Sequence, residues 1–87
     1  MKKITMFVLK NCPYCHEALR FMDQLYETDG RYRQIPLETI DEKKHPEIAD
    51  KYDYYYVPTF YVGEKKMHEG AASLQAVKHV FDEALKP

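Results

Sequence analysis

The sequence predicts an α/β fold in which a four-stranded mixed sheet is flanked by helices, with the element order β-α-β-α-β-β-α. Three observations carry this prediction. An apolar run near the N-terminus changes at once to a helical period, a second strand-like run contains a proline, and two β-rich runs flank a glycine turn. A strand, a helix and a strand in succession form a βαβ unit, so the first two strands should be parallel with a right-handed crossover.

The first strand and helix follow from a change of period. Residues 4–9 form an apolar run with lysines on both sides, which predicts a buried central strand. Pro13 suits the first helical position, because the N–H that proline lacks has no partner there. Gly30 predicts the end of the helix. The inward residues recur at helical spacing, at Cys15, Ala18 or Leu19, Met22, and Leu25 or Tyr26.

The second strand, around Ile35 to Ile40, should lie at an edge of the sheet, because Pro36 cannot donate a hydrogen bond to a central ladder. A short helix then runs from Pro46 towards Tyr52. Residues 59–62 and 67–70 predict a hairpin around a turn at 63–66. Ser73 predicts the cap of a last helix, whose inward face comprises Leu74, Val77, Phe81, Ala84 and Leu85.

Length and composition indicate a single domain over residues 1–87, with 45% hydrophobic residues available for a core. The net charge is −1 and the charges are interspersed, so neither nucleic acid nor a membrane is expected as a partner. The N-terminal apolar run is shorter than the roughly 7–15 residues that a secretion signal needs. No segment is long enough to span a bilayer. We therefore expect a cytoplasmic protein, and a monomer.

Both cysteines of the chain lie in the motif Cys12-Pro13-Tyr14-Cys15. Where thiols are kept reduced, a CxxC pair is more typical of a redox or metal site than of a structural disulfide. The free amides of the first helical turn and the helix dipole favour a thiolate at Cys12, and Lys10 adds positive potential. Cys15 lies one turn into the helix and is more shielded. This pattern predicts that Cys12 attacks a disulfide and Cys15 resolves the product.

The motif has three other interpretations. The cysteines supply half of a structural zinc site, but His16, His45 and His68 form no recognisable second pair. Cys15-His16 completes the C-x-x-C-H pattern of haem attachment, which the βαβ pattern and the missing export signal oppose. Two buried cysteines acting as small hydrophobic residues are disfavoured by an N-cap position. We predict no metal ligands.

The CPYC motif after the first strand, Val57-Pro58 before the third, the glycine after the hairpin and the element order resemble the glutaredoxin/thioredoxin family over nearly the whole chain. The resemblance implies the thioredoxin fold, with Cys12 as the attacking and Cys15 as the resolving cysteine. It implies a cis bond at Val57-Pro58 that turns the Val57 backbone towards a bound thiol compound. CPYC is typical of glutaredoxins, whereas VPTFYVGEKKMHEG is similar to the thioredoxin hairpin.

The chain departs from glutaredoxins where glutathione would bind. Tyr56 replaces a common threonine, Lys10 lies two rather than three residues before the first cysteine, and residues 70–73 lack the acidic pair. Backbone amides at Ala72 and Ser73 are still expected to bind a carboxylate. The predicted substrate-binding residues are Lys10, Pro13, Tyr14, Tyr56, Val57, Pro58, Gly70, Ala72 and Ser73.

An aromatic cluster precedes Val57 and has two interpretations, a platform beside Cys12 or ordinary half-buried packing. Packing is at least as good an explanation for two of its members, Tyr52 and Tyr54. The cluster comprises Tyr52, Tyr54, Tyr55 and Tyr56.

The resemblance implies a thiol–disulfide oxidoreductase that reduces protein disulfides or glutathione mixed disulfides without an obligatory cofactor. Electrons would come from glutathione as co-substrate or from a thioredoxin-reductase-type flavoenzyme. The alternative function is a thioredoxin-fold binding module that carries an iron–sulfur cluster or a metal through Cys12. By the same resemblance, Pro13 argues against the cluster.

Overall fold

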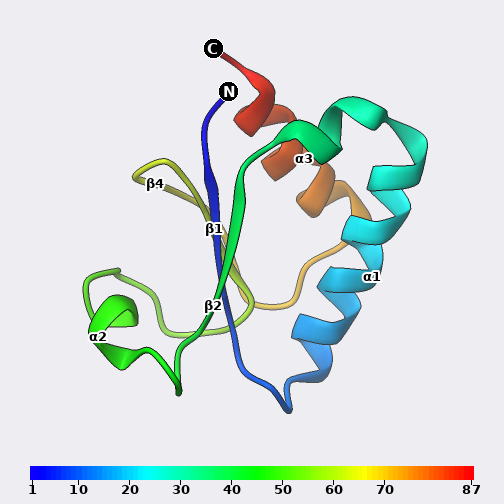
Figure 1. The fold of residues 1–87 in the computed structure, drawn as a ribbon. Helices are drawn as coiled ribbons and strands as arrows, with labels where there is room; N and C mark the ends of the chain where they lie inside the picture. The colour runs from blue at the N-terminus through cyan, green and yellow to red at the C-terminus, as the bar shows by residue number, and fades with distance from the viewer.

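The computed structural model describes residues 1–87 and contains the predicted order of strands and helices. Figure 1 shows the sheet lying between helices, with both chain termini at the same end of the molecule. One element was not predicted, a short 3-10 helix after the first α-helix. The elements are β1 (Ile4–Val8), α1 (Pro13–Thr28), η1 (Gly30–Gln34), β2 (Leu37–Asp41), α2 (Pro46–Ala49), β3 (Thr59–Val62), β4 (Lys65–Glu69) and α3 (Leu74–Leu85).

The four strands form one mixed sheet in the order β2-β1-β3-β4. β1 is central and pairs in parallel with β2, Ile4 lying opposite Leu37, and antiparallel with β3. β2 is an edge strand, as Pro36 predicted. Parallel pairing of β1 and β2 brings the loops that follow these strands to the same end of the sheet.

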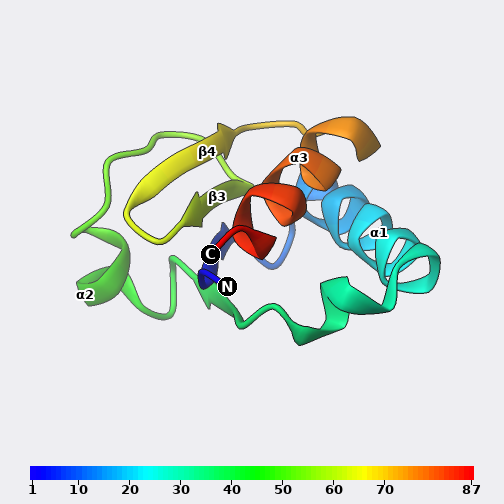
Figure 2. The same cartoon turned by 90° about the horizontal axis from the view of Figure 1, so that it is seen from above.

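Helices cover both faces of the sheet. Figure 2 shows α1 and α3 on one side of the sheet and the short α2 on the other. Because neighbouring residues of a strand point to opposite faces, Met6 belongs to the large core under α1 and α3, and Phe7 to the small core near α2. Val77 and Phe81 of α3 are buried in the large core, as predicted, together with Val80, which was not predicted. Leu74 and Leu85 are only partly buried.

The inward face of α1 consists of Cys15, Ala18, Met22 and Leu25. Where the sequence pattern left two choices, the structure buries Ala18 rather than Leu19, and Leu25 more fully than Tyr26. None of the helices combines the length and the apolar character needed to cross a membrane.

Several element boundaries differ from the prediction, and β2 begins at Leu37 because Ile35 instead caps the end of the 3-10 helix. α2 ends at Ala49 rather than near Tyr52, because the chain continues as a turn in which the Tyr52 N–H binds the Ala49 carbonyl at 3.0 Å. The hairpin turn is also shorter than predicted, so that Lys65 and Lys66 belong to β4. Gly63 provides the left-handed conformation of this turn, with φ of 58°.

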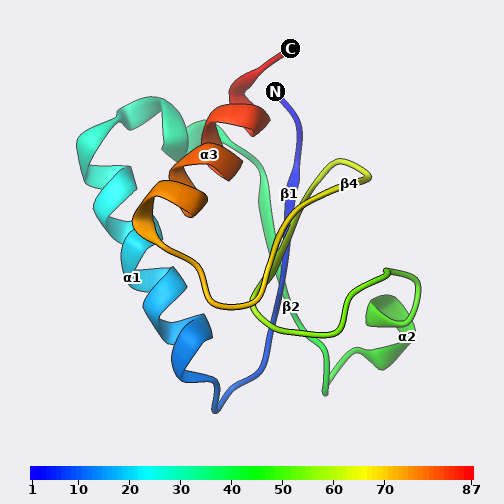
Figure 3. The same cartoon turned by 180° about the vertical axis from the view of Figure 1, so that it is seen from behind.

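The end of β1, the start of α1 and the loop before β3 all lie at the end of the sheet opposite the chain termini, as seen from behind in Figure 3. A bond from the Glu42 N–H to the Val8 carbonyl, 3.1 Å long, joins the segment after β2 to the end of β1. This end of the molecule holds the two cysteines.

Candidate active site

Cys12 is the N-cap residue of α1. Its backbone is extended, with φ of −110° and ψ of 107°, and its Sγ accepts a hydrogen bond of 3.1 Å from the Cys15 N–H. Pro13 occupies the first turn, which contains no acidic residue. The positive end of the helix therefore faces the Cys12 sulfur, and no acidic side chain in the first turn offsets this positive potential. Negative charge on the sulfur is favoured as a result.

Cys15 lies one turn further along α1 and is only 1% exposed. Burial raises the pKa of the Cys15 thiol to about 12, and its hydrogen bond with Cys12 acts in the same direction. Cys12 is partly exposed, and both cysteines are free thiols. The structure therefore distinguishes an accessible sulfur from a buried one that keeps its proton at neutral pH. It also excludes the interpretation in which both cysteines are buried.

The Val57-Pro58 peptide bond is cis, as the resemblance implied. The carbonyl oxygen of Val57 lies 3.8 Å from the Cys12 Sγ. The Val57 N–H forms no hydrogen bond within the chain. A backbone donor and a backbone acceptor, 45 residues away in sequence, are thus placed beside the accessible sulfur.

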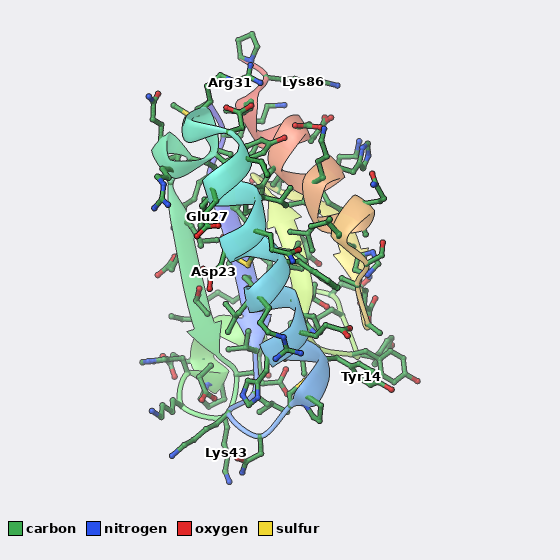
Figure 4. All side chains as sticks on the ribbon, turned by 90° about the vertical axis from the view of Figure 1, so that its right-hand side faces the viewer. Tyr14, Asp23, Glu27, Arg31, Lys43 and Lys86 are labelled. Carbon is green, nitrogen blue, oxygen red and sulfur yellow. The ribbon has the colours of Figure 1, made fainter.

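The aromatic cluster before Val57 divides into two parts. Tyr52 and Tyr54 pack on Phe7, with ring centroids 4.7 Å apart in both cases, so these two rings belong to the small core. Tyr55 and Tyr56 are instead 86% and 71% exposed. Tyr14 is 57% exposed, and Figure 4 shows its ring projecting from the start of α1. We call Tyr14, Tyr55 and Tyr56 the tyrosine rim.

Lys10 lines a hollow of about 630 Å³ between the loops that follow β1 and β2, together with Asn11, Lys43 and Lys44. Figure 4 shows Lys43 at the same end of the molecule as Tyr14, with Arg31 and Lys86 at the opposite end. The only carboxylate that lines the hollow, Asp41, already accepts hydrogen bonds from the backbone N–H groups of Lys43 and Lys44, 2.9 and 3.2 Å long. The hollow beside the Cys12 loop is therefore positively charged.

Three further predicted substrate-binding residues lie around α3 and the end of β4. Gly70 donates its N–H to the Pro58 carbonyl over 2.8 Å, so it fastens the loop that carries Val57. Ser73 caps α3, its Oγ accepting the Ala76 N–H at 3.0 Å, and Ala72 is buried. No hydrogen bond connects Ala72 or Ser73 to the cysteines, whereas Gly70 is connected to the Val57-Pro58 loop.

The histidines do not complete a metal site around the cysteines. His16 is exposed, with its Nε2 2.8 Å from the Lys10 carbonyl, and His68 is similarly placed 2.9 Å from the Ala71 carbonyl. No three His, Cys, Asp or Glu side chains lie close enough to hold a metal ion. The residues present therefore do not fit a structural zinc ion bound within one chain.

Sequence reasoning missed two parts of this end of the molecule. Lys43 and Lys44 lie beside Lys10 because β1 and β2 are parallel, which the predicted βαβ unit already implied. The other is Glu69, whose carboxylate binds the N–H groups of Tyr55 and Tyr56. No sequence pattern indicates this contact, because it depends on an irregularity in the pairing of β3 with β4.

The chain belongs to the thioredoxin domain family, whose sequence model matches residues 2–82. Two solved structures are similar to it. One is described as the structure of a malarial protein, with 21% identity, a TM-score of 0.69, and coverage of 95% of this chain and 96% of that one. The other is oxidised thioredoxin from Plasmodium falciparum, with 20% identity, a TM-score of 0.70, and coverage of 95% and 80%.

At these identities the structural likeness concerns the fold alone. None of the curated proteins matches the chain by sequence. Together, the thioredoxin-like domain and the two close cysteines indicate a thiol oxidoreductase.

Proposed function

We propose that this protein reduces protein disulfides or glutathione mixed disulfides by a dithiol cycle through Cys12 and Cys15. The observation that carries the proposal is the contrast between the two sulfurs. Cys12 is accessible and accepts a hydrogen bond from the helix N-terminus, whereas Cys15 is 1% exposed. Such an arrangement provides one nucleophile and one reserve thiol.

In the first step, the Cys12 thiolate attacks one sulfur of the substrate disulfide. A bond forms between Cys12 and that sulfur, the substrate S–S bond breaks, and the other substrate sulfur departs as a thiolate. The hydrogen bond from the Cys15 N–H and the positive end of the helix dipole stabilise negative charge on the Cys12 sulfur as it attacks.

In the second step, Cys15 attacks the Cys12 sulfur. A Cys12–Cys15 disulfide forms, the mixed disulfide breaks, and the proton of Cys15 passes to the departing substrate thiolate. Two electrons have then moved from the protein to the substrate. The high pKa of buried Cys15 prevents it from competing with Cys12 for the first attack.

Substrate is held beside Cys12 by backbone pairing and by side-chain contacts. Val57 offers a free N–H and a carbonyl next to the sulfur, which pair with an extended segment as one more strand would. The tyrosine rim provides the aromatic surface around this contact, with the exposed Pro13 beside it. The side chain of Pro58 is buried, so this residue acts by shaping the loop. Gly70 acts through the Pro58 carbonyl, and the backbone amides of Ala72 and Ser73, which precede α3, are proposed to bind a carboxylate of the substrate.

We further propose glutathione as the electron donor. Glutathione carries two carboxylates, and the Lys10 hollow has three lysines whose charges form no ion pair. Two glutathione thiols would be oxidised to glutathione disulfide while the Cys12–Cys15 bond is reduced to two thiols. The cycle needs no bound cofactor, and one chain carries both cysteines, so a monomer is sufficient. A cytoplasmic location suits the cycle because that compartment keeps thiols reduced.

The donor is tested by following NADPH consumption with a disulfide substrate and each reducing system in turn. We expect rapid turnover with glutathione and its reductase, and slow turnover with thioredoxin reductase. Rapid turnover with thioredoxin reductase and slow turnover with glutathione would identify the flavoenzyme as the electron donor, and the proposed dithiol cycle would be unaffected. Slow turnover with both systems would contradict the proposed function if the protein also fails to accelerate the reduction of the substrate by dithiothreitol above the uncatalysed rate.

A further inference from the structure

Glu69, the last residue of β4, fastens the loop that carries two members of the tyrosine rim. Its Oε2 accepts the N–H groups of Tyr55 and Tyr56 at 2.5 and 2.9 Å. Its Oε1 accepts a hydrogen bond of 2.8 Å from the Lys66 ammonium. The Glu69 side chain is only 20% exposed. Both oxygens of one carboxylate are therefore engaged in holding a surface loop.

The hairpin is shaped so that Lys66 and Glu69 can meet. In a regular strand, residues three apart point to opposite faces of the sheet. Here the pairing shifts between Phe60 and Tyr61, so that Phe60 lies opposite His68 whereas Tyr61 lies opposite Lys66. This bulge adds one residue to β4 and brings the two side chains to the same face.

The rest of the loop at 53–58 is fastened to β3 and β4 as well. The Asp53 carbonyl accepts hydrogen bonds from the Tyr61 hydroxyl at 2.7 Å and from Lys66 at 3.1 Å. The Tyr56 carbonyl accepts the Thr59 hydroxyl, and the Pro58 carbonyl accepts the Gly70 N–H. The Val57 N–H, between these points, has no partner, and the carbonyl of the same residue lies next to Cys12.

We propose that Glu69, oriented by Lys66, is a positioning residue that holds Tyr55, Tyr56 and the Val57 backbone in place for an extended polypeptide substrate at Cys12. This inference rests on the proposed function and names its substrate class. A polypeptide disulfide requires the tyrosine rim and pairing with the Val57 backbone in order to bind, whereas a small thiol-reactive compound requires only access to the Cys12 sulfur. Glu69 therefore governs the recognition of protein disulfides and leaves the reactivity of Cys12 unchanged.

The hydrogen bonds from the Tyr55 N–H, the Tyr56 N–H and the Lys66 ammonium to the Glu69 carboxylate are present throughout the neutral pH range. The Lys66 ammonium from β4, with the Tyr55 and Tyr56 N–H groups from the loop, holds the pKa of the Glu69 carboxyl at about 2, below its ordinary value of 4.5. A carboxyl with a lowered folded-state pKa contributes stability above its unfolded-state value, and this contribution is lost as the pH falls through the folded-state value. The stability advantage of wild type over Glu69→Gln should thus be present at pH 7 and disappear near pH 2.

The test compares Glu69→Ala and Lys66→Met with wild type, using a protein disulfide as substrate and iodoacetamide as a small probe of Cys12. We expect Glu69→Ala to raise KM roughly tenfold, the loss expected for hydrogen bonds to a charged group, with kcat changed by less than about twofold. Glu69→Gln keeps an acceptor oxygen and should restore part of the affinity. The alkylation rate of Cys12 should not change. Glu64→Ala, in the exposed turn of the same hairpin, is the matched control.

Amide hydrogen exchange gives a readout that does not depend on activity. The Tyr55 and Tyr56 amides should be protected in wild type and in Glu64→Ala, and should exchange faster in Glu69→Ala, Glu69→Gln and Lys66→Met. An unchanged KM in these variants, or unchanged exchange of both amides, would overturn the proposal even if Glu69→Ala fails to fold. A wild-type protein that reduces no disulfide would overturn the proposed function instead.

Discussion

Replacing Cys12 by serine should lower kcat/KM for disulfide reduction by roughly three orders of magnitude or more, to the rate without enzyme. A serine hydroxyl stays protonated at neutral pH and cannot form the mixed disulfide. The turnover of a protein disulfide with each electron donor measures this loss. Serine is also a preferred N-cap residue, so α1 should keep its first turn.

An unchanged circular dichroism spectrum and melting temperature of Cys12→Ser would show that the loss is chemical. The assigned roles would be contradicted if Cys12→Ser and Cys15→Ser retained equal activity, because the two sulfurs differ in exposure and in hydrogen bonding.

Cys15→Ser should accumulate covalent complexes with substrates. The first attack by Cys12 still occurs, but no second thiol is present to release the mixed disulfide. With a protein disulfide, non-reducing electrophoresis should show a band at the combined mass that disappears with dithiothreitol. With glutathione mixed disulfides, glutathione itself can release Cys12, so this activity should persist.

Cys15→Ala is the companion variant, because Cys15 is buried and a serine hydroxyl at that position lacks a solvent partner. The double variant Cys12→Ser with Cys15→Ser is the control and should form no complex. If trapping requires Cys15 and not Cys12, the order of attack proposed above is wrong.

The fold could be predicted from the sequence because its elements differ in period. The apolar run of β1, the helical spacing after Pro13, and Pro36 immediately before the edge strand identified the βαβ unit and its place in the sheet. The 3-10 helix at 30–34 was not predicted, since its short polar sequence has no apolar period. The end of α2 was misplaced because Tyr52 packs on Phe7 from a turn rather than from a helix.

The candidate site was only partly predictable. The cysteine motif and Val57-Pro58 are local patterns, and the structure brings them within 3.8 Å of each other. Packing was one of the two interpretations of Tyr52 and Tyr54, and the structure packs both rings on Phe7, whereas no sequence pattern indicated the exposure of Tyr55 and Tyr56. Glu69 gave no signal, since its contacts with Tyr55 and Tyr56 require the bulge in the hairpin.

The tyrosine rim and the Lys10 hollow lie at the same end of the molecule as Cys12 and differ in chemistry. The rim is aromatic and highly exposed, while the hollow carries three lysines. In our proposal, the rim with the Val57 backbone receives protein substrates and the hollow receives the carboxylates of glutathione. Specificity within this thioredoxin-domain chain would then reside in the loops that follow β1 and β2, the start of α1 and the loop that precedes β3.

The central claim is that the first turn of α1 makes Cys12 the reactive sulfur while burial keeps Cys15 inert. Limiting iodoacetamide added at pH 7 to the fully reduced protein, followed by tandem mass spectrometry of the peptide that contains both cysteines, measures this directly. The claim predicts that the first label falls almost entirely on Cys12. Equal labelling of the two sulfurs, or faster labelling of Cys15, would contradict it.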